Sequence, residues 1–350
     1  MKSPRYPRMR NFKSPIFLAA LYFLLNTGCK KSDTQQFTPG FNVYMAGTVN
    51  NAAVFWKNGQ GTELAPYSGA TCIAVAGTDR FVGGMLNSVP VYWKNGQSNS
   101  LGLSAASVTG IALSGSDVYL SGAGQGNPFI DSTGDIMVNG NTAGYWKNGV
   151  FNILENTPRV SAAEGICFSG TDMYVVGHAA GATDTAAQWK NGVRMNLTSD
   201  NGQTNIAYAV AVSGTDIYVV GVHNNLPVYW KNAVMNTLNL SGSPGQAGGF
   251  ATAIAVVGTD VYIAGATNSP VSGYQATYWK NGVSTVLSAN TSDVSNANGI
   301  AVAGSDIYVV GIVTSAGSNT SNSYSPVYWK NGVEYKLSGT GSINAICVGN

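Results

Sequence analysis

Residues 326–332 read Pro-Val-Tyr-Trp-Lys-Asn-Gly, and the tetrad that closes this stretch recurs along the whole chain. Trp-Lys-Asn is followed by Gly, or once by Ala, and these copies contain all seven tryptophans of the 350 residues. The copies begin at Trp56, Trp93, Trp146, Trp189, Trp230, Trp279 and Trp329. A period of roughly 40 to 50 residues indicates a repeat architecture, in which one small unit packs against copies of itself.

A second motif, Gly-(Ser/Thr)-Asp-x-(Tyr/Phe)-x-x-Gly, accompanies each tetrad. It begins at Gly77, Gly115, Gly170, Gly214, Gly258 and Gly304, and a degenerate copy begins at Gly40. A short apolar run such as Ile300-Ala301-Val302 precedes each motif. β-Branched and aromatic residues between Gly, Asn and Asp are typical of strands and hairpins. Asn-Gly predicts a type I′ turn, so Ala233, the one Ala at this position, should be strained by on the order of 1 kcal/mol.

Each repeat therefore supplies four antiparallel strands, A to D, which is the content of one blade of a β-propeller. The N-terminal copy has strands B, C and D only, and residues 345–350 repeat the A strand alone. Joined, the two ends make a seventh blade and leave no open sheet edge. The sequence therefore predicts an all-β, seven-bladed propeller closed by its C-terminal strand. One tryptophan per blade at a fixed position is a packing pattern, so we expect the tryptophans between the blades.

The N-terminal segment has basic residues, a short apolar run from Ile16 to Leu25, and then Leu25-Asn26-Thr27-Gly28-Cys29. This resembles a bacterial lipoprotein signal, although Leu25 lies four rather than three residues before the cysteine. Lys30-Lys31-Ser32-Asp33 resembles the segment that follows the lipidated cysteine in Bacteroidota. The resemblance implies a signal peptide (1–28), lipidated Cys29 with a polar tether (29–39), and a propeller (40–350). It also implies export and anchoring to the cell envelope, at the outer membrane. The alternative is ordinary signal cleavage, with Cys29 incidental.

The net charge of +2 depends on that segment. Five of the 18 basic residues lie before residue 29, which leaves 13 basic against 16 acidic side chains, or −3. Without a basic patch, nucleic acid is not an expected partner, and the membrane is expected to be contacted through the lipid anchor only. We expect a monomeric domain.

The turn lengths separate two faces of the propeller. The A–B and C–D turns are short in every repeat and lie on one face, here the constant face. The B–C and D–A connections vary in length and lie on the other, the variable face. The constant face should carry a ring of aspartates and a ring of lysines. The aspartates favour a role as turn side chains, with a cation site as the alternative. The lysines are expected to be solvated turn flanks that pair loosely with carboxylates.

Binding residues are expected among the connections of the variable face, because variable loops on a rigid scaffold usually carry function. The longest insertion, 123–144, contains Phe129, Asp131 and Asp135. The two aspartates weakly suggest calcium but lack the ligand series of an EF-hand, and no cofactor is predicted. His178 and His223, with Asp184, form a weak metal candidate whose alternative is a pair of solvated histidines. The remaining aromatic candidates are Phe250, Tyr274 and Tyr324.

No nucleophile elbow, phosphate loop or zinc-protease motif occurs, so the sequence does not indicate an enzyme. The repeat loosely resembles the HAF-type extracellular repeats of bacteria in the order of its Val-x-Gly, Trp-x-x-Gly and Leu elements. This resemblance implies no defined activity. We therefore expect a non-catalytic envelope protein that binds a glycan or a protein on its variable face. Two alternatives stay open: a carbohydrate-active enzyme that uses loop carboxylates, and a scaffold subunit of an envelope complex.

Overall fold

The computed structural model describes residues 37–102, 106–130, 136–138, 141–155, 160–179, 184–199, 204–240, 248–269, 273–288, 293–314 and 324–349. The chain divides into two compact units, Met1–Gln36 and Phe37–Asn350, and every described residue belongs to the second. No helix long and apolar enough to cross a membrane occurs among the described residues.

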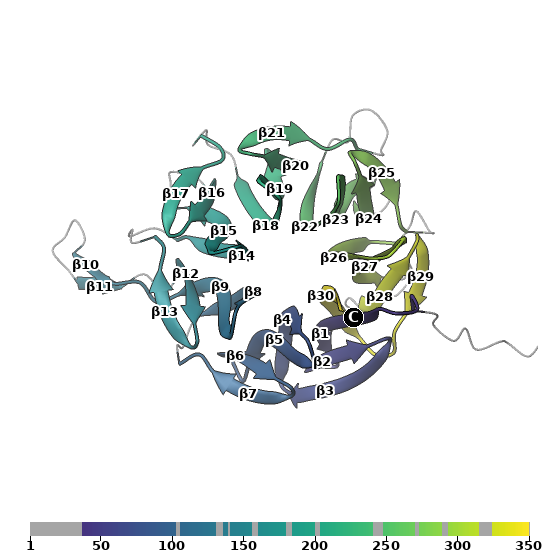
Figure 1. The fold of residues 1–350 in the computed structure, drawn as a ribbon, viewed down its shortest axis with the longest axis horizontal. Helices are drawn as coiled ribbons and strands as arrows, with labels where there is room; N and C mark the ends of the chain where they lie inside the picture. The colour runs from purple at the N-terminus through teal and green to yellow at the C-terminus, as the bar shows by residue number, and fades with distance from the viewer. Residues whose placement is uncertain are drawn as a thin grey trace, which may run out of the picture. The chain divides into compact units, whose positions relative to one another are not determined.

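Seven four-stranded antiparallel sheets are arranged around one axis, which confirms the predicted propeller (Figure 1). Blade 1 contains β30 (Gly341–Gly349), β1 (Asn42–Val49), β2 (Ala52–Lys57) and β3 (Gln60–Pro66). Blade 2 contains β4 (Ser68–Ala76), β5 (Asp79–Leu86), β6 (Val89–Lys94) and β7 (Gln97–Ser100). Blade 3 contains β8 (Ser107–Ser114), β9 (Asp117–Gly124), β12 (Thr142–Lys147) and β13 (Val150–Ile153), with an inserted hairpin of β10 (Pro128–Ile130) and β11 (Ile136–Val138).

The remaining four blades follow the same order without inserted strands. Blade 4 contains β14 (Ala162–Ser169), β15 (Asp172–Ala179), β16 (Thr185–Lys190) and β17 (Val193–Asn196). Blade 5 contains β18 (Asn205–Ser213), β19 (Asp216–His223), β20 (Leu226–Lys231) and β21 (Val234–Thr237). Blade 6 contains β22 (Gly249–Val257), β23 (Asp260–Ser269), β24 (Gly273–Lys280) and β25 (Val283–Val286). Blade 7 contains β26 (Ser295–Ala303), β27 (Asp306–Thr314), β28 (Tyr324–Lys330) and β29 (Val333–Lys336).

The ring closes through blade 1, as the two ends of the sequence predict. β30 pairs antiparallel with β1 from Asn42 opposite Gly349 to Val49 opposite Gly341. In Figure 1 the A strands, including β30, lie nearest the axis and the D strands lie outermost. The C-terminal strand therefore supplies blade 1 with its innermost strand, and its pairing removes the sheet edges that an open ring would expose.

The turn residues adopt the left-handed backbone that the Asn-Gly motif requires. Asn281 has a φ of 50° and Gly282 a φ of 81°. Ala233 has a φ of 65°, which confirms the left-handed conformation expected at the one C–D turn without glycine and disfavoured for a residue with a Cβ. The B–C connection Asn224-Asn225 is also a two-residue turn with positive φ, at 52° and 61°. Strands B and C are hydrogen-bonded up to this turn, so they extend further toward the variable face than their apolar runs suggest.

The tryptophans lie in the core between blades and are at most 5 % exposed. Trp329 of blade 7, for example, shares a cluster with Leu287 of blade 6. The second glycine of the repeated motif is required by the close approach of a neighbouring backbone. A Cβ added at Gly311 would overlap the carbonyl oxygen of Asn296 on the neighbouring A strand. Glycine at this position therefore allows the A strand to bulge toward it.

The chain just before β1 is fixed to blade 7. The hydroxyl of Thr38 donates a hydrogen bond to Asp306 Oδ2 at 2.7 Å, and its backbone N–H donates to Tyr308 Oη at 3.0 Å. The Phe37 ring stacks on Tyr308 with 6.0 Å between centroids. Since Asp306 begins β27 at the constant face, Phe37 and Thr38 lie at that face.

Candidate functional site

Each pair of turns on the constant face of blades 2 to 7 is joined by the same side-chain contacts. In blade 6, Asn281 Nδ2 donates to Asp260 Oδ1 at 2.9 Å, and Lys280 Nζ lies 3.0 Å from Asp260 Oδ2. Asn281 Oδ1 in turn accepts the Val261 N–H at 2.9 Å. The six Lys–Asp distances run from 2.7 to 3.0 Å. The aspartates thus tie the A–B turn to the C–D turn.

The lysines of blades 2 to 6 are about half exposed and each is paired with an aspartate, as expected of solvated turn flanks that pair with carboxylates. The ammonium of Lys280 also lies 5.1 Å from the centre of the Tyr262 ring. The hydrogen bond from Asn281, followed by that from Lys280, lowers the pKa of the Asp260 carboxyl below its ordinary value. Both carboxylate oxygens accept from neighbouring side chains, and the charge is balanced locally. The contacts therefore favour the turn role of the aspartates over a cation site.

The axial channel is lined by one extra residue from each A strand. A β-bulge interrupts the pairing of strands A and B in every blade, for example between Ala297 and Gly299, and its extra residue faces a cavity of about 220 Å³. A bulge turns one side chain away from the normal alternation of the strand. The seven bulge residues are Thr71, Thr109, Glu164, Tyr208, Thr252, Asn298 and Asn344.

Five of the bulge residues join adjacent blades around the axis, because their side chains donate to a backbone carbonyl of the next blade. The three threonine bonds are Thr71 to Val108 at 2.8 Å, Thr109 to Ala163 at 2.6 Å and Thr252 to Ala297 at 2.7 Å. The two asparagine bonds are Asn298 to Ile343 at 2.9 Å and Asn344 to Ala70 at 2.7 Å. Strand A starts at the variable face and the bulge lies in its first half, so this ring lies toward the variable-face mouth of the channel.

Glu164 interrupts the ring in blade 4. Its carboxylate has no hydrogen-bond partner among the described residues, and His178 Nδ1 lies 3.8 Å from its Oε1. His178 Nδ1 is itself buried without a hydrogen-bond partner in the described structure. Burial raises the pKa of Glu164, and burial lowers the pKa of His178 against the opposing effect of Asp184. Both side chains thus retain unused hydrogen-bonding capacity at the channel.

Tyr208 interrupts the ring in blade 5. Burial raises the pKa of its phenol, and Glu164, Asp184 and Tyr274 add to that shift electrostatically. In blade 6, Phe250 and Tyr274 meet edge to face with 5.1 Å between ring centres, and Tyr274 is 39 % exposed. We call these side chains of adjacent blades 4 to 6 the acid–aromatic sector, which consists of Glu164, His178, Asp184, Tyr208, Phe250 and Tyr274.

The other candidate histidine has a different environment. His223 ends β19 rather than lying in a loop. Its Nδ1 lies 2.6 Å from Asn205 Oδ1 and its Nε2 lies 3.1 Å from Asn224 Nδ2. Both ring nitrogens are therefore occupied. The described residues contain no group of three His, Cys, Asp or Glu side chains placed to hold a metal ion.

The remaining predicted residues lie outside the sector or outside the described residues. Tyr324 begins β28 of blade 7, opposite Thr314. Phe129 is the middle residue of β10 and pairs with Met137, so part of the long insertion is a hairpin. Asp131, Asp135 and Cys29 are not among the described residues.

Sequence reasoning singled out neither Tyr208 nor Glu164. The sequence nevertheless contains a pattern that distinguishes these two residues. The residue two positions before the central Ile or Val of strand A is Thr or Asn in five blades, as at Thr252 before Ile254. Glu164 and Tyr208 are the exceptions in adjacent blades, and an exception to a repeat is where a specific function can be sought.

Comparison with known proteins gives no relative by sequence. No protein-family model matches the chain, and no curated protein matches it. Among solved structures, the chain is similar to the computationally designed Ika8 protein, with 17% identity, a TM-score of 0.42 and 78% of each chain covered. It is also similar to a chain of a nidogen/laminin complex, with 11% identity, a TM-score of 0.43, and 88% of this chain and 98% of that chain covered.

Proposed function

We propose that this protein is a non-catalytic binding protein whose ligand occupies the variable face over the acid–aromatic sector. The observation that carries the proposal is the contrast between the two faces. On the constant face of blades 2 to 7, each carboxylate of the turns is paired within its own blade. At the channel mouth, Glu164 and His178 have no hydrogen-bond partner among the described residues, although both are largely buried.

The chemistry of the sector favours a neutral, hydroxyl-rich ligand such as a glycan. An exposed tyrosine ring such as Tyr274 can stack on the apolar face of a sugar, while Glu164 and Tyr208 can exchange hydrogen bonds with hydroxyl groups. The net charge of −3 beyond residue 28 gives no attraction for nucleic acid.

A glycan-array screen of the propeller unit, with calcium and with chelator, tests this function. We expect specific binding that is lost in Glu164→Gln and in Tyr274→Ala. Tyr324→Ala is the matched control, because it removes an aromatic ring from a strand start of blade 7, outside the sector. Equal loss in all three variants, or no binding by the native protein, would contradict the proposal for glycans.

Two further outcomes would favour the alternatives. Shortened products of a bound glycan would indicate a carbohydrate-active enzyme, and the loss of turnover in Asp131→Asn or Asp135→Asn would identify loop carboxylates as its acids. A protein that co-purifies in fixed proportion and is released by Tyr274→Ala would indicate a protein ligand, as expected of a scaffold subunit.

We also propose that the protein is exported and anchored to the outer membrane by a lipid on Cys29. The support is the resemblance of the first residues to a lipoprotein signal. Metabolic labelling with an alkynyl fatty acid should label the native protein and leave Cys29→Ala unlabelled. Equal labelling of both would refute the anchor.

A further inference from the structure

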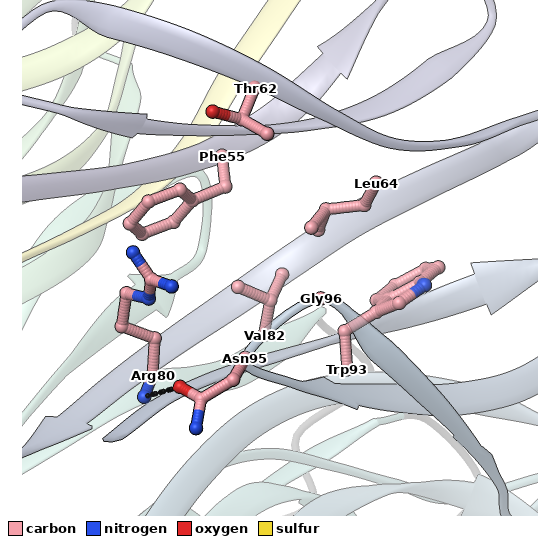
Figure 2. Close-up of a pocket in the computed structure, with 8 residues that line it drawn as sticks. All are labelled: Phe55, Thr62, Leu64, Arg80, Val82, Trp93, Asn95 and Gly96. Atoms are coloured by element: carbon pink, nitrogen blue, oxygen red, sulfur yellow. Dashed lines mark hydrogen bonds between the residues drawn. The ribbon is translucent and has the colours of Figure 1, made fainter. Parts of the chain in front are cut away.

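A pocket of about 130 Å³ lies between blades 1 and 2, away from the acid–aromatic sector (Figure 2). Phe55 and Leu64 of blade 1 form one wall, and Val82 and Trp93 of blade 2 form the other. Arg80 belongs to the lining, and Figure 2 shows its guanidinium turned toward the Phe55 ring. The pocket is therefore mostly apolar, with a single cation.

Arg80 departs from the repeat. The residue that follows the motif aspartate is apolar in the other blades, as at Val118, Met173 and Val261, where it adds to the core between blades. Arginine can fill this position because its aliphatic stem covers apolar surface while its head reaches out. The guanidinium carbon lies 5.1 Å from the centre of the Phe55 ring.

The guanidinium of Arg80 has no carboxylate partner among the described residues. Of the lysines and arginines described, only Lys57 and Arg80 lack an acid within 4.0 Å. The adjacent Asp79 is already held by Lys94 at 3.0 Å and by Asn95 at 2.8 Å. The planar guanidinium can therefore offer its donors to a ligand.

The D strand of blade 1 also contributes to the lining of the pocket. Its D strand, β3, has seven residues, whereas the D strands of the other blades have four. A register shift opposite Ala53 and Val54 makes Leu64 the extra residue of β3. Leu64, in the extension of this strand, and Thr62, among its first four residues, both line the pocket.

We propose that this pocket binds a carboxylate carried on a short apolar body. A carboxylate matches the two parallel donors of a guanidinium, and an arginine stacked on an aromatic ring is held in place for such a pair. Phe55, Leu64 and Val82 would contact the apolar body. Two sources share this chemistry: a free branched short-chain acid, and the C-terminal carboxylate of a peptide that ends in an aliphatic residue. The site is independent of the proposed glycan site.

Titration of the isotope-labelled protein with 3-methylbutanoate tests the proposal, with the Arg80 Nε–H and Trp93 indole N–H resonances as readout. A ligand of this size should bind with a Kd on the order of 1 mM. The neutral 3-methylbutanamide should bind about tenfold or more weakly, because it lacks the charge-assisted pair. A tripeptide ending in leucine, compared with its C-terminal amide, distinguishes a peptide from a free acid.

Two variants of equal charge change provide the control. Arg80→Met installs the residue that blade 4 already has at this position, Met173, so the fold should accept it, and binding should weaken about tenfold or more. Lys57→Met removes the other cation that has no acid partner within the described part of the chain. This lysine lies over the Tyr44 ring, and its loss should leave binding unchanged. Unchanged affinity in Arg80→Met, equal affinity for acid and amide, or no saturable shift would each overturn the proposal.

Discussion

Replacing Glu164 with threonine should make the protein more stable while it removes a group from the channel mouth. Three blades have threonine at this bulge, and each hydroxyl donates to the next blade. A threonine at position 164 should reach the carbonyl of Ala207, a hydrogen bond that contributes about 1 kcal/mol. Removing a carboxylate that burial disfavours adds on the order of 1 kcal/mol at neutral pH, a discounted figure because 22% of the side chain is exposed and hydrated.

The combined gain of about 2 kcal/mol should raise the melting temperature by roughly 3 °C, since an unfolding entropy of ~2.1 cal/mol/K per residue applies to a unit of this size. Scanning calorimetry at several pH values measures it. The pKa of Glu164 is raised in the folded state, so the native protein loses stability as pH rises through the ordinary carboxyl value of 4.5. The advantage of Glu164→Thr should therefore be smaller at pH 4 than at pH 7.

Thr109→Glu is the reciprocal control and should be destabilising, because it breaks the 2.6 Å bond to Ala163 and buries a charge. A lower melting temperature for Glu164→Thr at pH 7 would refute the reasoning. It would mean that Glu164 itself holds the seam between blades 4 and 5, for example as a protonated donor. An unchanged pH dependence would refute the electrostatic part alone.

Ala233→Gly should stabilise the protein by about 1 kcal/mol, because Ala233 adopts a φ of 65° that favours glycine. Gly282→Ala should lose a similar amount, since nothing lies within 4 Å of the added Cβ and only backbone strain changes; guanidinium unfolding measures both. Deleting residues 343–350 should abolish cooperative unfolding in circular dichroism, because blade 1 loses its innermost strand. Asp306→Asn should lower the free energy of unfolding by about 1 kcal/mol at neutral pH and by less in acid. Pairing with Lys330, Thr38 and Asn331 lowers the pKa of Asp306 to about 2. The stability that this pairing contributes is therefore lost as the pH falls from about 4 to 2.

Each of these predictions has an outcome that contradicts it. No gain in Ala233→Gly would show that the turn at Asn232 relaxes without strain. A truncated protein with the native melting temperature would mean that β30 is dispensable for closure. Equal stability of Asp306→Asn and the native protein, from acid to neutral pH, would mean that the contact with Thr38 adds nothing.

The fold was predictable because its determinants are local and repeated. Asn-Gly specifies a turn by backbone conformation alone, and it recurs at the same distance from a buried tryptophan such as Trp279. Ring closure could be predicted because the N-terminal repeat lacks strand A and the last residues of the chain repeat strand A alone. The bulges were not predictable in this way. Thr252 and Asn298 are ordinary polar residues in a strand, and only the crowding of A strands around the axis turns them toward the channel.

The candidate site was predictable in part. His178, Phe250 and Tyr274 were expected on the variable face, and the structure places all three near strand ends that lie toward it. Which of them meet depends on which blades are neighbours and on how far each strand extends. Tyr208 faces the channel only because of the bulge in its strand, which the sequence did not predict. Arg80, which lines the second pocket, lies in the repeated motif between the aspartate and the aromatic residue that define it, and was therefore not singled out.

The attachment of Phe37 and Thr38 to blade 7 has a mechanical consequence. Force applied to the chain upstream would reach Asp306 and Tyr308 before it reached the pairing of β1 with β30. The load would then be borne by a turn that Lys330 and Asn331 already brace, and the closing seam of the ring would be spared.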